Sequence, residues 1–240
     1  MKKKIFLNVY FLIIITAEIF VSRSLTAQVP SYKMFATNIT QPASNIIEFD
    51  IYLLRTGSTP LELAAVQVGL QFDSAITKLT TSSPPYHSYV VASYIAGSTQ
   101  LNVNQAPPNQ LMASVKANGW AGDHVFKIVS ASIVGAGNGT IISNSNPGCS
   151  NPGMRVGRFR ITNQQTSTNT TPVPFNANTQ CNGIFGYPHS GTLYHTAVFA
   201  YLAGQTLTTD ISDSTQHYSY NTAGTCFNNL ILNPTPILQL

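Results

Sequence analysis

Two carboxylates with a spacing suited to chemistry lie in one short segment, at Glu48 and Asp50. The alternating pattern around them places both side chains on one face of a strand, about 7 Å apart. Carboxylates at that spacing are able to bind Ca²⁺ or, with a partner, to cleave a glycosidic bond. Strand alternation by itself also puts polar residues on an outer face. We favour this simpler interpretation, in which both residues are solvated.

The sequence lacks the motifs of common enzymes and metal sites. It contains no G-x-S-x-G elbow, no H-E-x-x-H pair and no D-x-[DN]-x-[DN]-G loop. The five histidines have no cysteine or carboxylate at the spacing of a zinc site. The glycine-rich segment Gly135–Gly139 follows an expected strand but opens no helix, so we interpret it as a flexible turn. We therefore predict no catalytic residue, no metal site and no cofactor.

Aromatic side chains are the better candidates for binding. Exposed rings stack on the apolar faces of sugars, and tyrosine suits this because it joins an apolar body to a polar tip. Packing in the core and at its rim is the alternative, because aromatic residues are common in sheets. Trp120 is flanked by glycines and is either a binding anchor or a plug over one end of the fold. The candidate ligand-binding residues are Trp120, Tyr86, Tyr89, Tyr94, Tyr218 and Tyr220.

The first 27 residues have the three-part pattern of a signal peptide. Three lysines precede a mostly apolar run from Ile5 to Phe20, and the segment ends on Leu25-Thr26-Ala27. Glu18 and Arg23 leave the apolar run shorter than the about 20 residues that a membrane-spanning helix needs. We therefore expect a secreted protein, extracellular or on the outer cell surface, whose mature chain has no transmembrane segment.

Removal of this leader changes the electrostatic balance of the chain. The whole sequence has 12 Lys and Arg against 8 Asp and Glu, and the leader holds four of the basic residues but one acid. Arg155, Arg158 and Arg160 form a small cluster, of which strand alternation places only Arg158 and Arg160 on one face. The mature chain is thus nearly neutral and lacks the basic stripe of a nucleic-acid-binding protein, so we expect no nucleic-acid partner.

Three cysteines, Cys149, Cys181 and Cys226, follow the leader. Export permits a disulfide, but the odd count leaves one thiol over and the sequence does not settle the pairing. We favour Cys181–Cys226, because both residues lie in the C-terminal block. The alternative is three buried, unpaired cysteines, since free cysteine packs as a small hydrophobic residue.

Short alternating segments separated by turns predict an all-β protein. In Asn45–Leu54 apolar and polar residues alternate, and Leu61–Asp73 repeats this pattern after the turn Thr56–Pro60. We expect these two strands to form a hairpin. Many short strands with turns between them favour a sandwich or a jelly roll. Further strands are expected at Tyr32–Ile39, His87–Ile95, Leu111–Val115, Val125–Val134, Met154–Thr162, Leu193–Ala203, Thr206–Ile211 and Gln216–Tyr220.

Three parts of the sequence resemble the secreted, cohesin-like β-sandwich modules of Bacteroidetes-type surface proteins. They are EFDIYLLRTGSTPLELAAVQVGLQFD (Glu48–Asp73), GMRVGRFRITN (Gly153–Asn163), and the closing blocks Ala200–Ile211 and Cys226–Pro234. The resemblance implies a cohesin-like or jelly-roll β-sandwich. It also favours glycan binding, because the cohesin fold is related to carbohydrate-binding modules. Such modules are often linked to type IX secretion through a C-terminal sorting domain, which this sequence does not show.

These observations predict one module over residues 28–234, after the signal peptide at 1–27 and before a linker or chain end at 235–240. We expect a non-catalytic secreted or cell-surface module that binds a polysaccharide or a protein partner in adhesion or as a scaffold. A structural spacer that presents another domain is the first alternative. The second is a secreted glycosidase or peptidase with dispersed residues, which the missing motifs disfavour. The sequence leaves the oligomeric state open.

Overall fold

The computed structural model describes residues 28–72, 89–107, 124–130, 134–144, 153–165, 168–175, 184–185, 196–213 and 217–218. In these residues the fold is all-β, with one short 3₁₀ turn at Val103–Gln105. No helix among them is long and apolar enough to cross a membrane. The strands are β1 (Tyr32–Ala43), β2 (Ile46–Arg55), β3 (Leu61–Phe72), β4 (Tyr89–Tyr94), β5 (His124–Ser130), β6 (Thr140–Ile142), β7 (Met154–Gln164), β8 (Ile184–Phe185), β9 (Ala197–Tyr201), β10 (Thr208–Asp210) and β11 (His217–Tyr218).

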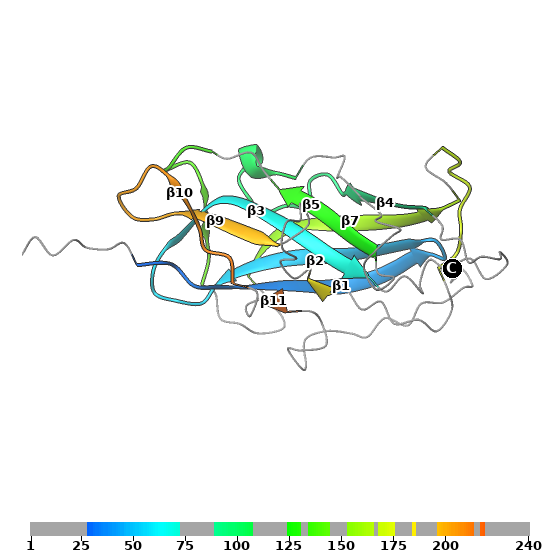
Figure 1. Ribbon diagram of the computed structural model, residues 1–240, viewed down its shortest axis with the longest axis horizontal. Helices are drawn as coiled ribbons and strands as arrows, with labels where there is room; N and C mark the ends of the chain where they lie inside the picture. The colour runs from blue at the N-terminus through cyan, green and yellow to red at the C-terminus, as the bar shows by residue number, and fades with distance from the viewer. Residues whose placement is uncertain are drawn as a thin grey trace, which may run out of the picture.

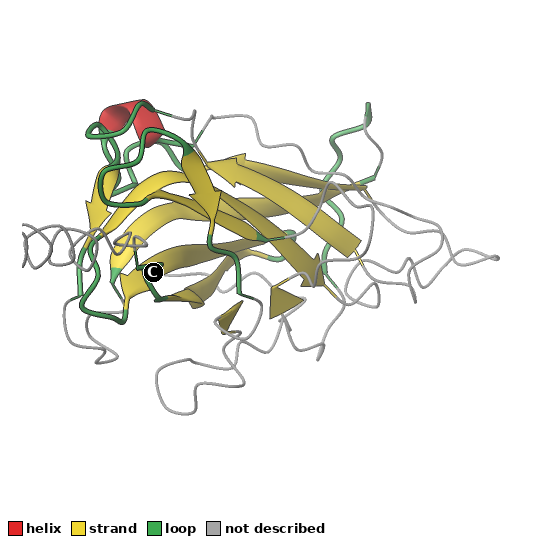
Figure 2. Cartoon of the chain, turned by 60° about the vertical axis from the view of Figure 1, so that its left-hand side comes forward, coloured by secondary structure: helices red, strands yellow, loops and turns green. Residues whose placement is uncertain are grey.

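The strands form two sheets that lie one over the other (Figures 1 and 2). The five-stranded sheet has the order β11-β1-β2-β7-β4, and its pairs are antiparallel except for β1 with β11. The six-stranded sheet has the order β10-β9-β3-β5, and β6 and β8 also pair with β3. β2 and β3 are the strands around which the two sheets are built.

The core lies between the two sheets and draws on the inner face of each. β2 contributes every second residue from Ile47 to Leu53, as its alternation predicts, and β3 contributes Leu63, Val66 and Val68. Each of these side chains is at most 3% exposed. Full burial of such a side chain stabilises the fold by roughly 1.5–3 kcal/mol, so the inner faces fix how the sheets pack.

The predicted hairpin of β2 with β3 is wrong. β2 pairs with β1 and β7, whereas β3 pairs with β9, β5, β6 and β8 in the other sheet. The segment Thr56–Pro60 therefore carries the chain from one sheet to the other. Each strand has one apolar face, and the two strands bury these faces against the same core from opposite sides.

The remaining strand predictions hold in outline, with differences at the ends. β1 begins at Tyr32 as predicted but extends past Ile39 to Ala43. Its pairing with β2 shifts register on either side of Thr40, and Asn38 takes a φ of 52° in this irregular part. The short strands β6 and β8 were not predicted. The expected strand Leu111–Val115 lies outside the described residues.

The glycine-rich turn before β6 is held in place. Backbone N–H groups of Gly137 and Gly139 donate to Oε1 of Glu62, at 2.6 and 3.0 Å. Close approach also requires glycine at position 139, because a Cβ there would lie 2.4 Å from the carbonyl oxygen of Leu63. The interpretation as a flexible turn missed this anchor, which comes from a strand more than seventy residues earlier in the chain.

Candidate functional site

The outer face of the five-stranded sheet carries the charged residues of β2 and β7. β2 turns Ile47, Phe49 and Ile51 inward, so Glu48 and Asp50 point away from the core. The strand register places Arg160 beside Glu48 and Arg158 beside Asp50. We call Glu48, Asp50, Arg155, Arg158 and Arg160 the arginine–carboxylate face.

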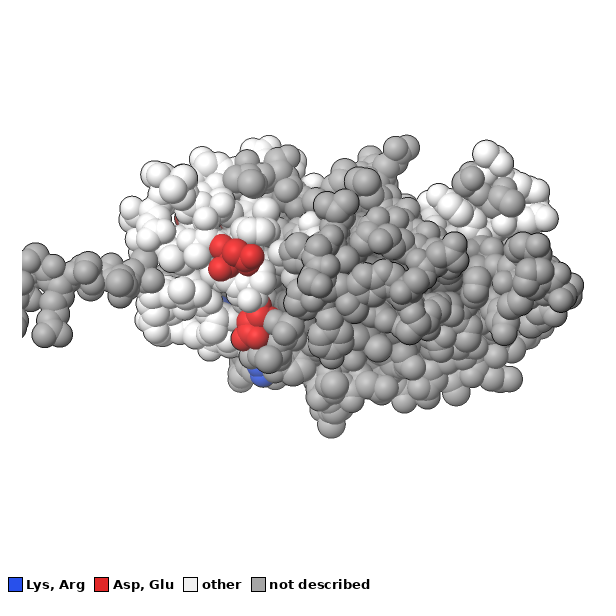
Figure 3. Space-filling model, in the orientation of Figure 1, with Lys and Arg blue, Asp and Glu red and all other residues white. Residues whose placement is uncertain are grey.

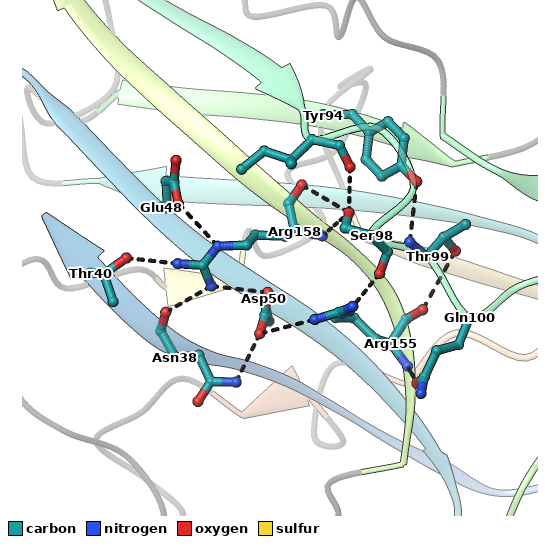
Figure 4. A network of polar contacts seen from close by, with 11 residues as sticks. Asn38, Thr40, Glu48, Asp50, Tyr94, Ser98, Thr99, Gln100, Arg155 and Arg158 are labelled. Carbon is teal, nitrogen blue, oxygen red and sulfur yellow. Dashed lines mark hydrogen bonds and ion pairs between the residues drawn. The ribbon is translucent and has the colours of Figure 1, made fainter. Parts of the chain in front are cut away.

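Arg158 is the centre of this face (Figure 4). Its Nε donates to Glu48 Oε2 at 3.1 Å, and its Nη1 donates to Asp50 Oδ1 at 3.2 Å. Nη1 also reaches the carbonyl oxygen of Asn38 at 3.3 Å, and Nη2 donates to Thr40 Oγ1 at 2.7 Å. One guanidinium group thus ties β7 to β2 and to β1, and all three of its nitrogens are engaged.

Arg155 also lies on this face, which corrects the prediction that only Arg158 and Arg160 share it. The pairing of β2 with β7 shifts register where Ile51 is opposite Gly157 and Tyr52 is opposite Arg155. Val156 and Gly157 are both buried, so the alternation of β7 is interrupted there. A β-bulge of this kind moves the following side chains to the other face. Arg155 Nη1 lies 3.9 Å from Asp50 Oδ2.

Asp50 is buried, Glu48 is half-buried and both are paired, so the prediction that they are solvated is wrong. The side chain of Asp50 is 3% exposed and that of Glu48 is 12% exposed. Asn38 Nδ2 donates to Asp50 Oδ2 at 2.8 Å, and Arg160 donates to Glu48 Oε1 from Nε at 2.9 Å and from Nη2 at 2.5 Å. The neighbouring strand supplies the countercharges that the pattern of β2 alone does not show.

The pKa of Glu48 follows from these contacts. Burial alone would raise the pKa of this carboxyl group, but the hydrogen bonds and charges of Arg160 and Arg158 outweigh burial and hold the pKa below its usual value. A general acid at neutral pH needs a raised pKa, so Glu48 is unsuited to that role. A Ca²⁺ ion would have to displace guanidinium groups from both carboxylates.

The loop after β4 supports β7 from its other side. Ser98 Oγ accepts a hydrogen bond from the backbone N–H of Arg158 at 2.8 Å, and its carbonyl oxygen accepts one from Arg155 Nε at 2.5 Å. Gln100 Oε1 accepts the backbone N–H of Arg155 at 2.6 Å. Figure 4 shows that this loop lies next to both arginines, so their backbone positions are fixed.

Arg160 and Arg155 are the exposed members of the face. The side chain of Arg160 is 43% exposed and that of Arg155 is 32% exposed, against 21% for Arg158. Nη1 of Arg160 makes no hydrogen bond within the part of the chain that the structure describes. Positive charge and at least one free donor therefore reach solvent beside two carboxylates that are already neutralised.

The structure describes the side chains of two of the predicted aromatic residues, Tyr89 and Tyr94. Tyr89 is half-buried at the start of β4 and shares the outer side of that strand with Ser93, which is paired with Arg160. Tyr94 points into the core instead, where it is 8% exposed and its ring centroid lies 5.9 Å from that of Phe159. This position gives Tyr94 the packing role that was the alternative to stacking on a ligand.

The other site predictions lie wholly or partly outside the described residues. The backbone of Tyr218 pairs with Phe35 as part of β11. The residues for which the structure makes no statement are Tyr86, Trp120, Tyr220, Cys181 and Cys226. The ring-stacking and disulfide predictions for these positions stay predictions.

A pocket of about 470 Å³ lies at another part of the molecule, between the start of β1 and the segment after β10. Ser31, Tyr32, Thr56, Ile211 and Asp213 help to line it. The hydroxyl of Tyr32 accepts the backbone N–H of Asp213 at 2.9 Å. Burial raises the pKa of Tyr32 to about 12, and the charges of Asp213 and Asp210 add to the rise. The hydroxyl group therefore stays neutral at physiological pH.

Acidic groups among the described residues do not assemble into a metal site. No group of three or more His, Cys, Asp or Glu side chains within those residues is placed to hold a metal ion. In the orientation of Figure 1, the described surface shows two acidic patches and very little Lys or Arg (Figure 3). The exposed guanidinium groups are thus not prominent on that side of the molecule.

Comparison with known proteins leaves the geometry as the main guide to function. No family model matches the sequence, and no curated protein is significantly similar to it. The arginine–carboxylate face is therefore the feature from which a function has to be inferred.

Proposed function

We propose that this protein is a non-catalytic secreted or cell-surface module that binds a polysaccharide or a protein partner on its arginine–carboxylate face. Its fold would then be the cohesin-like or jelly-roll form of the β-sandwich that the sequence resembles. One observation carries the proposal. Arg160 is 43% exposed and keeps a free donor, while every carboxylate of the face is already paired.

Binding fits the face better than catalysis does. Glu48 and Asp50 are held by three guanidinium groups and an amide, so both carboxylates are already occupied by partners from the protein itself. Acid–base chemistry needs a group whose pKa is tuned to the working pH, and the pKa of Glu48 is shifted downward.

The same contacts prepare the face for a ligand. Arg155 is fixed through its side chain and its backbone, and Arg160 is fixed by Glu48, so a ligand would meet donors that are already ordered. Binding to ordered groups avoids the entropy cost of fixing flexible side chains. Ser93 is half-buried beside Arg160, and Thr162 follows two residues later on β7, so hydroxyl groups border the guanidinium groups.

The test is retention of the purified full-length protein on immobilised polysaccharides and on extracts of cell-surface proteins. We expect retention of the wild-type protein and reduced retention of Arg160→Gln. The matched control is Lys127→Gln, which removes the same charge from β5 of the other sheet. Failure of the wild-type protein to bind any polymer or surface protein would favour the spacer alternative. Hydrolysis of an offered polymer would contradict a non-catalytic role.

A further inference from the structure

We infer that the arginine–carboxylate face selects polysaccharides that carry carboxylate groups, with Arg160 and Arg155 as two separate anion-binding points. This inference rests on the proposed binding function and names its ligand class. It follows from where the unmatched positive charge lies, from the distance between the two arginines, and from the kind of side chains around them.

The unmatched charge lies at the flanks of the face. Three guanidinium groups meet two carboxylates, so one positive charge has no counterpart within the face. Arg158 lies between Glu48 and Asp50 and is fully engaged. Asp50 already accepts from Arg158 and Asn38 at 3.2 and 2.8 Å, whereas Arg155 is 3.9 Å away from it. Arg155 is therefore the least neutralised of the three.

Arg160 is the second anion-binding point, because one nitrogen of its guanidinium group is free among the described residues. Its Nε and Nη2 both donate to the same oxygen of Glu48, which leaves Nη1 for a ligand. A guanidinium group is planar and keeps its charge at any physiological pH, and its N–H groups match the oxygens of a carboxylate. An anionic group that approaches from solvent would bind at this edge without displacing Glu48.

The separation of these points favours a polymer over a small anion. Arg155 and Arg160 are five residues apart on β7, which corresponds to roughly 15 Å of strand after allowance for the bulge. Arg158 lies between them on the face, so a carboxylate that binds Nη1 of Arg160 leaves Arg155 for a second anionic group. A chain with a carboxylate on successive sugar rings engages both, and the second contact forms at a high effective concentration.

The surroundings favour a polysaccharide over an acidic protein. Protein interfaces usually have an apolar, desolvated centre. The large hydrophobic side chains that are exposed among the described residues all lie off this face, at Val29, Val103, Ile141 and Leu207. Tyr89, Ser93 and Thr162 supply a ring and hydroxyl groups on the β4 side of the face, which suits contacts with sugar hydroxyls and the faces of sugar rings.

The test compares an acidic with a neutral polysaccharide. Purified full-length protein is titrated with polygalacturonate and with cellulose-derived oligosaccharides at low and at physiological salt. We expect binding of polygalacturonate that is at least tenfold tighter and that weakens with salt, as exposed charge contacts do. We expect Arg160→Gln and Arg155→Gln each to weaken it about fivefold, and the double variant to lose it. Lys127→Gln should bind like the wild-type protein.

Separate controls test the role of the charge and the folding of the variants. Arg160→Lys keeps the charge but not the planar fork, so it should retain salt-dependent binding at lower affinity. Each variant must remain fully folded under the binding conditions, as its circular dichroism spectrum and its urea unfolding curve show. Monomeric galacturonate should compete poorly, because it reaches one arginine at a time.

Three results would overturn the inference. Equal binding of neutral and acidic polymers, unchanged in the arginine variants, would remove the acidic preference and leave the proposed function intact. Capture of an acidic protein without any polysaccharide would assign the face to a protein partner. Absence of all binding would remove the proposed function as well.

Discussion

Arg158 holds the carboxylate of Asp50 across the β2–β7 pair, with 3.2 Å between Nη1 and Oδ1 and 3% of the Asp50 side chain exposed. Removal of Arg158 leaves the buried charge of Asp50 with Asn38 at 2.8 Å and with Arg155 only at 3.9 Å, and breaking a buried ion pair in this way costs about 3–5 kcal/mol. We therefore expect Arg158→Met to lower the free energy of unfolding by about that amount in urea denaturation.

Two further variants test whether the cost of Arg158→Met comes from the unpaired charge of Asp50 and from its burial. Asp50→Asn combined with Arg158→Met removes both charges and should be less destabilising than Arg158→Met alone. Arg160→Met removes a more exposed pair and should cost less than about 1 kcal/mol. Equal costs for Arg158→Met and Arg160→Met would show that the burial of Asp50 contributes nothing.

Acid should lower the stability of the protein by protonating Glu48. The pKa of this carboxyl group is held below its ordinary value of 4.5, so its paired form adds stability that is fully present above pH 4.5 and is lost as the pH falls through the lower, folded-state pKa. The stability difference between the wild-type protein and Glu48→Gln, measured from pH 7 to pH 3, should therefore shrink below about pH 4.5. A difference that stays constant over this range would contradict the assigned ion pairs.

Alkali should lower the stability of the protein by ionising Tyr32. Burial raises its pKa from 10.0 to about 12, so its neutral form adds stability that is complete below pH 10 and is lost as the pH approaches 12. Tyr32→Phe keeps the ring but removes the ionisation and the hydrogen bond from Asp213. The stability advantage of the wild-type protein over this variant should fall between these pH values in unfolding experiments. An advantage that persists at pH 12 would mean that the hydroxyl is not buried.

Two glycines with positive φ allow backbone strain to be compared with and without a steric clash. Gly153 precedes β7 with a φ of 109°, and a Cβ there would lie 2.4 Å from the carbonyl oxygen of Leu53. Gly97 has a φ of 75° with nothing within 4 Å of such a Cβ. We expect Gly97→Ala to cost about 1–2 kcal/mol from conformational strain alone. Gly153→Ala should cost clearly more, because the backbone of β2 would have to move. Thermal unfolding of the two variants makes the comparison.

The charged face could be predicted in part from the sequence. Alternation in β2 correctly placed Glu48 and Asp50 away from the core, and alternation in β7 placed Arg158 and Arg160 together. Opposite charges that alternate in the same way in two strands are a signal that the strands pair, as β2 and β7 do. The sequence does not state which strands pair, however, so alternation in β2 alone predicts solvated carboxylates.

Arg155 shows why the rest of the face could not be predicted. Regular alternation assigns it to the side opposite Arg158, and the register shift near Val156 moves it to the same side. A bulge is a property of two paired strands, and its position depends on how both fit the core. Tyr94 is a similar case, because whether a strand tyrosine is exposed depends on which of its faces meets the other sheet.

The all-β class and the inward residues of the long strands are determined by the sequence itself, because side-chain alternation is a local consequence of extended backbone geometry. Strand partners, the passage from β2 to β3 between sheets, and the union of three arginines with two carboxylates are decided by tertiary structure. These features depend on contacts between segments about a hundred residues apart, as between Glu48 and Arg158. Such contacts form only when both sheets close on the shared core.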